Sequence, residues 1–266
     1  MDVAEQLRPL STATLQRRTA RLEQAGPPHN DPRQPVSKDE ALSAAVRAYL
    51  SHPREERRLS GVPLPSWLCE QLLAELRTLH WPPCSHRPAL DSEAYLILTI
   101  KKGGTLTSGF GTQHPLHRLR LLCSDVLAVA DPDFIPSAVA VTKNLVGSPH
   151  IDHFDRSYQL AVSLGDFKGG ELCIDEESAD PESSDVSPEQ DAKPWHRVAV
   201  VETRNRVAKV DGRYVHWVRP HSGGDRFSII FYNTSADPAH PLGPAVHPLS
   251  IPVTRLEIWN SLSSSI

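Results

Sequence analysis

Cysteines are few in this sequence, and long apolar runs are missing. The chain of 266 residues has four cysteines and no CxxC pair, a pattern typical of reduced thiols in an intracellular protein and not of a disulfide framework. The longest apolar runs, such as residues 95–100, are far too short to cross a bilayer. The chain also opens without a charged start followed by a long apolar core. We therefore expect no membrane partner and no secretory signal.

Strong positive charge is missing as well. The formal net charge is −4, but residues 175–191 hold eight acidic residues and no basic one, which leaves +4 for the rest of the chain. A body of modest positive charge is compatible with an anionic partner. It is nevertheless far from the basic surface of a protein that coats DNA.

Proline, charge and apolar spacing divide the chain into three parts. Residues 1–60, rich in Arg, Gln and Pro, are predicted to be a flexible and largely disordered tail. Residues 61–235 form the predicted folded domain, interrupted by a disordered acidic surface loop at 175–192, where like charges, Ser and Pro replace apolar residues. Residues 236–266 are predicted to be a Pro-rich C-terminal extension.

Helices come first in the predicted domain. Ser66 is placed to cap a helix with a leucine stripe that ends before Pro82, and a second amphipathic helix follows Pro115. From Ser137 onward, short candidate strands are separated by glycine-containing turns. The strands are expected at 138–146, 158–164, 171–174, 197–202, 207–210, 214–218 and 226–232, after an earlier one at 94–101.

This order of elements predicts the fold class. Several short strands at such spacing indicate an antiparallel sandwich or jelly roll. We therefore expect an α+β, mainly β protein: a double-stranded β-helix (jelly roll) with N-terminal helices packed on one outer face.

A metal-binding pattern lies in the strand-rich region. His150 and Asp152 are two residues apart, and in an extended chain that spacing directs both side chains to one face. His216, on a later strand, fits as a third ligand, and two histidines with one carboxylate leave open positions on iron(II) for substrates and oxygen. The pattern His-x-Asp is weak alone, because it occurs three times: His29 with Asp31 lies in the Pro-rich tail, while His153 with Asp155 overlaps the favoured pair and competes with it.

A candidate carboxylate-binding pair follows ten residues after His216. Arg226 and Ser228 share one face of a predicted strand. A guanidinium can hold a carboxylate through two parallel hydrogen bonds, and a hydroxyl can add a third, as the distal carboxylate of 2-oxoglutarate requires. The alternative is that Arg226 merely begins a hairpin strand and pairs with a nearby acid.

Four blocks of sequence together resemble a known superfamily. They are NLVGSPHID at 144–152, LGDFKGGEL at 164–172, DGRYVHWVRP at 211–220 and GGDRFS at 223–228. In order and spacing they resemble the iron(II)/2-oxoglutarate-dependent dioxygenases, and within them most of all the TET/JBP group of nucleobase oxygenases. The resemblance extends over roughly residues 131–232.

The resemblance implies a set of site residues and cofactors. It assigns Fe(II) to His150, Asp152 and His216, with no catalytic residue beyond these ligands, and 2-oxoglutarate to Arg226 together with Ser228. O2 is the oxidant, and ascorbate is compatible as a reductant. Asn144 and Tyr158 are expected near the substrate or behind the ligands.

The resemblance also implies a reaction. A dioxygenase of this kind would hydroxylate a C–H bond, here the methyl group of 5-methylcytosine or thymine in DNA, and would then act in the nucleus. Two alternatives stay open: the same chemistry on a protein side chain, RNA or a small metabolite, in the cytoplasm, and a catalytically silent jelly-roll binding module. The sequence makes no prediction of oligomeric state.

Overall fold

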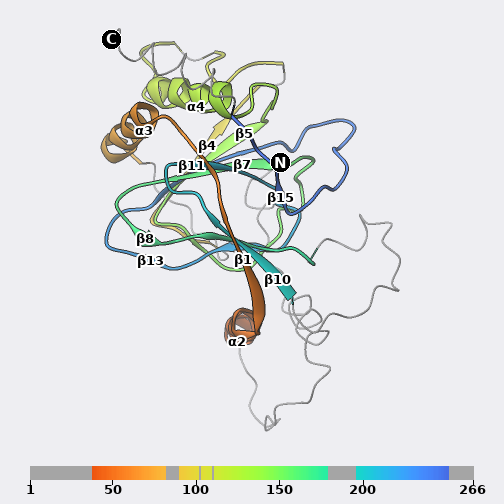
Figure 1. Ribbon diagram of the computed structural model, residues 1–266. Helices are drawn as coiled ribbons and strands as arrows, with labels where there is room; N and C mark the ends of the chain where they lie inside the picture. Colours follow the sequence, from red (N-terminus) through yellow and green to blue (C-terminus); the bar gives the residue numbers. More distant parts are fainter. Residues whose placement is uncertain (1–37, 82–89, 102, 110, 179–195, 252–266) are drawn as a thin grey trace, which may run out of the picture.

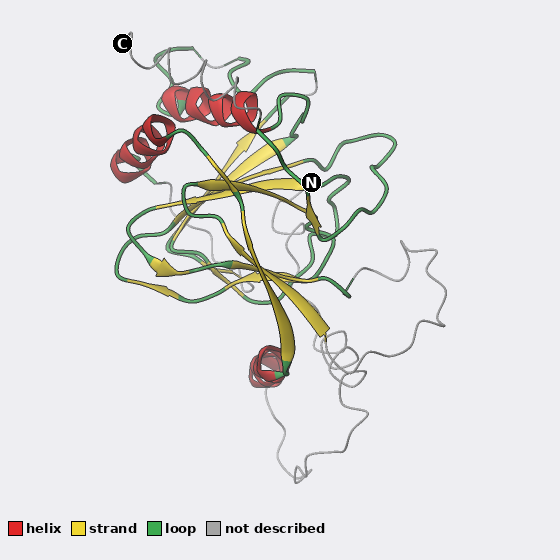
Figure 2. Cartoon of the chain, in the orientation of Figure 1, coloured by secondary structure: helices red, strands yellow, loops and turns green. Residues whose placement is uncertain are grey.

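The chain folds into two facing β-sheets with helices on both outer faces (Figures 1 and 2). The structure, a computed structural model, describes residues 38–81, 90–101, 103–109, 111–178 and 196–251. The described part is mainly β and has three α-helices. None of its helices is long and apolar enough to cross a membrane.

The larger sheet has seven strands and carries one wall of the central cavity. Its order is β15-β11-β7-β14-β5-β4, with β2 paired to β11. All its pairings are antiparallel. The strands are β2 (Val62–Pro63), β4 (Ala94–Thr99), β5 (Ala138–Lys143), β7 (Gln159–Leu164), β11 (Arg206–Val210), β14 (Phe227–Tyr232) and β15 (Val246–His247).

The smaller sheet has four strands, in the order β1-β10-β9-β12, and faces the larger one. Its strands are β1 (Arg54–Ser60), β9 (Leu172–Asp175), β10 (His196–Glu202) and β12 (His216–Val218). Two small ladders complete the structure: β3 (Leu90–Asp91) with β6 (Val146–Gly147), and β8 (Lys168–Gly169) with β13 (His221–Ser222).

The path of the chain between the two sheets is that of a double-stranded β-helix. From β7 the chain crosses to β9 and β10, returns to β11, crosses to β12 and returns to β14. Strand alternation follows from this path, because one face of each strand lines the interior and the other meets a helix. The predicted jelly roll is confirmed.

The outer face of the seven-stranded sheet is covered by α3 (Ser66–Thr78) and α4 (His117–Ala130). Their leucine and valine stripes pack against the odd-numbered residues of β14, such as Phe227 and Phe231. Ser66 is the first helical residue and makes no capping bond, since Pro65 takes the cap position. A third helix, α2 (Lys38–Ser51), covers the opposite outer face, where Tyr49 packs against Trp217.

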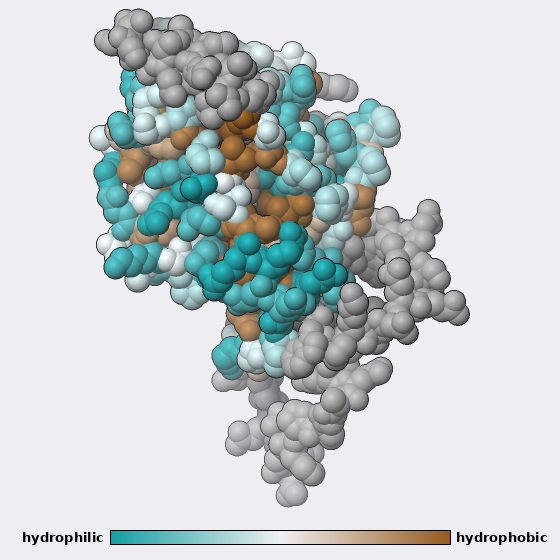
Figure 3. Space-filling view, viewed as in Figure 1, coloured by the Kyte–Doolittle hydropathy of each residue, from teal (hydrophilic) through white to brown (hydrophobic). Residues whose placement is uncertain are grey.

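The folded part is larger than the sequence predicted. Helix α2 and strand β1 belong to the fold although they lie within residues 1–60, and β15 in the C-terminal extension pairs with β11. At the acidic loop, Asp175 ends β9 and is buried. The sequence did not predict β1, because five of the seven residues in REERRLS are charged. It is an edge strand with a hydrophilic surface (Figure 3). The predicted disorder at residues 1–37 and 179–192 falls outside the described residues.

Candidate active site

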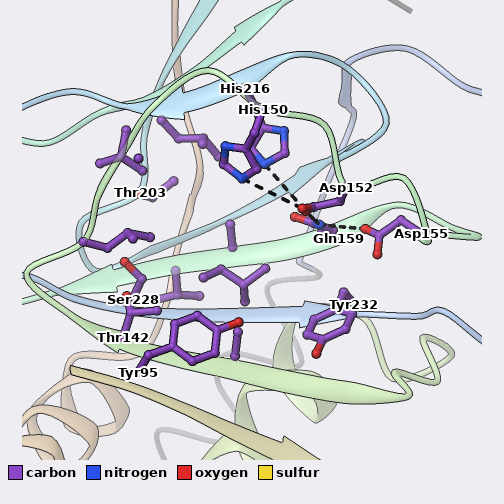
Figure 4. Close-up of a pocket in the computed structure, with 18 of the residues that line it drawn as sticks. Tyr95, Thr142, His150, Asp152, Asp155, Gln159, Thr203, His216, Ser228 and Tyr232 are labelled. Atoms are coloured by element: carbon purple, nitrogen blue, oxygen red, sulfur yellow. Dashed lines mark hydrogen bonds and ion pairs between the residues drawn. The ribbon is translucent and has the colours of Figure 1, made fainter. Parts of the chain in front are cut away.

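A cavity between the two sheets brings the predicted site residues together. It encloses about 910 Å³ of space, part of it open to solvent. His150, Asp152 and His216 line one side, and Ser228 lines the same cavity from the seven-stranded sheet (Figure 4). Arg226, directly before β14, also lines this cavity. Most of the remaining wall is apolar, as in small-molecule sites generally.

The two histidines and the aspartate converge on one point. The Nε2 atom of His150 lies 3.8 Å from Oδ1 of Asp152, and Nε2 of His216 lies 3.6 Å from Oδ2. One potential ligand atom from each residue lies within 4.8 Å of the others. Within the described ranges this is the one such group of three His, Cys, Asp or Glu side chains.

Backbone pairing explains why residues far apart in sequence meet here. His150 and His216 form an antiparallel β-bridge, with N–H to O distances of 3.0 and 2.9 Å. The amide of Asp152 donates to the carbonyl of Gly212 at 2.9 Å. Between the two ligands, the side chain of Ile151 is buried with the core on the outer side of the four-stranded sheet, so the period-two reasoning holds.

Each imidazole is oriented by a second hydrogen bond. Nδ1 of His150 donates to the carbonyl of Ser148 at 2.8 Å, and Nδ1 of His216 donates to the carbonyl of Tyr214 at 2.9 Å. This leaves an Nε2 lone pair on each ring facing Asp152, the form that binds a metal. Burial, with the neighbouring His216, lowers the pKa of His150 to about 4, so this ring is neutral near pH 7.

The carboxylate between these rings fits a cation. Oδ1 of Asp152 is buried and has no hydrogen-bond partner among the described residues. A buried carboxylate with an imidazole lone pair beside each of its oxygens is costly unless a positive charge lies between these groups. A divalent metal held by the three side chains would remove that cost, so the residues fit the predicted Fe(II).

The overlapping pair His153 and Asp155 does not form a second centre. The side chain of His153 is exposed, whereas Asp155 is buried in the cavity wall. Burial, reinforced by the nearby Asp152, raises the pKa of Asp155 well above its usual range. Asp155 also accepts a hydrogen bond from Gln159 at 2.6 Å.

Arg226 is a buried cation on the cavity wall. Its side chain donates from Nε to the carbonyl of Gly170 at 3.1 Å and from Nη1 to the hydroxyl of Ser228. Only 2% of the residue is exposed, and burial lowers its pKa to about 10. No carboxylate of the described residues lies within ion-pair distance of it; the neighbouring Asp225 pairs with Lys143 instead. An anion in the cavity would supply the missing partner.

A glycine turn makes room for Arg226. Gly170 has φ +71°, and a Cβ there would lie 2.9 Å from both Cδ and Nε of the arginine. Both the left-handed backbone and the close contact require glycine at this position. The GG pair of the LGDFKGGEL block therefore has a physical role in placing the guanidinium.

Asn144 and Tyr158 lie outside the cavity wall. The Asn144 side chain accepts from the Arg226 amide at 2.9 Å and donates to Asp225 at 2.9 Å, so it fixes the turn that precedes β14. Its location is therefore behind Arg226. Tyr158 instead packs on Phe134 and donates to Asp131, on the helix-covered side of the sheet. Tyr158 therefore does not line the cavity, because strand alternation directs Gln159 inward instead.

Several cavity residues were missed by sequence reasoning. Gln159 donates to Asp152 and Asp155, and Thr142 lies opposite Ser228 in the β5–β14 register. The hydroxyl of Thr142 is buried without a hydrogen-bond partner among the described residues. Period-two alternation places each on the face opposite to its neighbours, but both faces of β5 and β7 are buried, so the sequence does not show which face lines the cavity. The wall also includes Tyr95, Phe154, Thr203 and Tyr232.

Two solved structures are among those similar to this chain. One is described as an oxidoreductase of the 2OG-Fe(II) oxygenase family from Burkholderia pseudomallei, with 14% identity and a TM-score of 0.38, over 63% of this chain and 78% of that one. The other is NgTET1 in complex with 5mC DNA, with 13% identity and a TM-score of 0.38, over 74% of this chain and 77% of that one. No protein-family model matches the sequence, and no curated protein matches it significantly.

Proposed function

We propose that this protein is an iron(II)/2-oxoglutarate-dependent dioxygenase. One observation carries the proposal: a single cavity is lined by a His-Asp-His cluster and by a buried arginine that lacks a carboxylate partner among the described residues. A metal site alone would fit many hydrolases. A metal site that shares a cavity with an unpaired guanidinium fits a metal-bound co-substrate with a distant carboxylate.

In this proposal each residue has a defined role. His150, Asp152 and His216 hold iron(II), while Arg226 and Ser228 bind the distal carboxylate of 2-oxoglutarate. Iron with 2-oxoglutarate would supply the activation of O2 and the oxidation of an unactivated C–H bond. The apolar wall excludes water and holds the substrate, and the histidine Nδ1 bonds keep both rings in the ligand tautomer.

For the substrate, we propose the methyl group of 5-methylcytosine or thymine in DNA. The support is the resemblance of the four sequence blocks to the TET/JBP oxygenases, together with a cavity that combines an apolar wall with polar groups at Gln159 and Asp155. A base in a duplex would have to be unstacked and rotated to reach such an enclosed site.

The test is a turnover experiment with separate readouts for chemistry and substrate. Iron-loaded protein is incubated with methylated or unmethylated duplex DNA, 2-oxoglutarate and O2; succinate and digested nucleosides are then measured by mass spectrometry. We expect oxidised nucleosides in proportion to succinate, and neither product with His150→Ala or Asp152→Ala. Succinate without nucleoside oxidation would reject the DNA substrate but keep the oxygenase, and would redirect the search to protein, RNA or metabolites. Absence of 2-oxoglutarate turnover with every substrate class would support a silent binding module.

A further inference from the structure

One amide group joins the metal cluster to the cavity wall. The Nε2 atom of Gln159 donates to Oδ2 of Asp152 and to Oδ2 of Asp155, both at 2.6 Å. The residue is 5% exposed and lies at the inward-facing start of β7. A primary amide nitrogen has two hydrogens, and here each is directed at a different carboxyl group.

This arrangement selects the oxygen of Asp152 that is left for a metal. Because Gln159 engages Oδ2, the plane of the carboxylate is fixed, and Oδ1 stays unpaired beside Nε2 of His150. Building on the proposed metal site, we propose that Gln159 is a positioning residue: it aligns Asp152 for the metal and ties that carboxylate to Asp155 on the wall of the substrate cavity.

The neutral amide suits this role better than other side chains. A lysine would neutralise Asp152 and weaken its attraction for a dication. A glutamate carboxylate would offer no donor hydrogen and would add a third carboxyl group to the cluster. Glutamine orients the carboxylate and leaves its charge in place for the metal.

A substitution at Gly212 can disturb the contact between Gln159 and Asp152 without changing either residue. A Cβ at this position would lie 2.4 Å from Nε2 of Gln159 and 3.0 Å from Oδ2 of Asp152. The φ angle of Gly212 is not in the left-handed region, so alanine can adopt this backbone. Gly212→Ala should therefore push the end of the Gln159 side chain away from Asp152, and the same Cβ would also lie close to Oδ2 of Asp152 itself.

The experiment is a double-mutant cycle read out by metal binding in the full chain. Metal-free wild type, Gln159→Leu, Gly212→Ala and the double variant are titrated with Co(II), and its visible absorption bands report both affinity and ligand geometry. Gln159→Leu should bind Co(II) about 10–100-fold more weakly and shift the bands. Gly212→Ala should also weaken Co(II) binding and shift the absorption bands in the same direction. The double variant should lose less affinity than the sum of the two single changes, because the part of the Gly212→Ala effect that acts through the amide is absent when residue 159 is leucine. Gln113→Leu, at an exposed position, is the matched control.

The outcomes separate this inference from the proposed function. Wild-type affinity and spectrum in Gln159→Leu, with binding lost in His150→Ala, would overturn the role of Gln159 and keep the metal site. Fully additive effects would show that Gly212 acts by another route and would also overturn it. Co(II) binding that does not depend on His150 would count against the metal site itself. If circular dichroism shows that Gln159→Leu does not fold, the test rests on Gly212→Ala, which retains the glutamine. Wild-type Co(II) affinity and spectrum in Gly212→Ala would then overturn the inference.

Discussion

At the scale of single residues, the unusual feature is a full positive charge held inside the protein. The guanidinium of Arg226 is fixed by Gly170 and Ser228 and faces the cavity. Burying an unpaired charge is costly, and the cost falls when an anion binds. In the proposed function, this buried charge favours the binding of a carboxylate, and the planar guanidinium fixes the orientation of that carboxylate.

Arg226→Lys tests this directly. The lysine keeps the charge but loses the planar, two-pronged guanidinium. Binding of 2-oxoglutarate, measured by calorimetry with Mn(II) present, should therefore weaken by about 1.5–3 kcal/mol in free energy. Arg204→Lys is the matched control, since that arginine also lies near the ring of Phe167 but does not line the cavity. An unchanged constant in Arg226→Lys would mean that another group holds the carboxylate.

Removing the hydroxyl of Thr142 should stabilise the ligand-free fold but weaken the binding of 2-oxoglutarate. This hydroxyl is buried without a partner among the described residues and lies opposite Ser228. Thr142→Val should raise the unfolding free energy of the ligand-free protein by about 1 kcal/mol. It should also weaken 2-oxoglutarate binding by about 0.5–1.5 kcal/mol, the value of one hydrogen bond. Thr112→Val, at an exposed position, should change neither quantity. Tighter binding of 2-oxoglutarate by Thr142→Val would exclude the hydroxyl as a ligand group.

At the scale of elements, the period-two alternation of a strand correctly predicted which residues share a face. Alternation along residues 226–232 placed Arg226 and Ser228 on one face, and the structure shows the other face packed on the helices. The sequence could not place Tyr158, because alternation fixes which residues share a face and not which face is inward. β1 was missed because its charged residues carry no apolar signal; its partner β10 supplies the apolar face. Hydrogen-bond links such as Gln159 to Asp152 depend on three-dimensional contact and have no sequence pattern.

The turn between β8 and β9 offers a test at this scale. Gly170→Ala should destabilise the fold by about 1–2 kcal/mol through its positive φ and should also weaken 2-oxoglutarate binding, because the added Cβ would displace Arg226. Gly103→Ala is a close control: its φ is +75°, but nothing lies within 4 Å of its Cβ position. It should share the destabilisation in denaturant unfolding without the change in affinity. Equal 2-oxoglutarate affinity in Gly170→Ala and the wild type would contradict the placement argument.

At the scale of the whole molecule, the four-stranded sheet depends on the segment before the predicted domain. α2 covers its outer face through Ala45 and Tyr49, and the Tyr49 hydroxyl donates to the carboxylate of Asp175. β1 extends the same sheet by parallel pairing with β10. Since β12 carries His216, the elements that stabilise this sheet also hold the His-Asp-His group in place.

A shortened chain measures that support. Starting the protein at Gly61 should lower its unfolding free energy by more than about 3 kcal/mol, because the cover over Trp217 and Val200 is lost. A chain starting at Lys38 keeps α2 and β1 and isolates their effect. Chemical denaturation followed by tryptophan fluorescence gives both values. Identical midpoints for the two chains would show that α2 and β1 contribute nothing to stability.

The parallel pairing of β1 with β10 also has a consequence for biosynthesis. The chain from β2 to β9 lies between the two partners, so β1 leaves the ribosome long before β10 exists. At about 5–20 residues per second, β1 must wait on the order of ten seconds for its partner. An apolar strand left unpaired for that time would be an aggregation hazard. The charged residues of REERRLS keep the unpaired strand hydrated. The charges that make β1 hard to predict from the sequence therefore also oppose aggregation of the nascent chain.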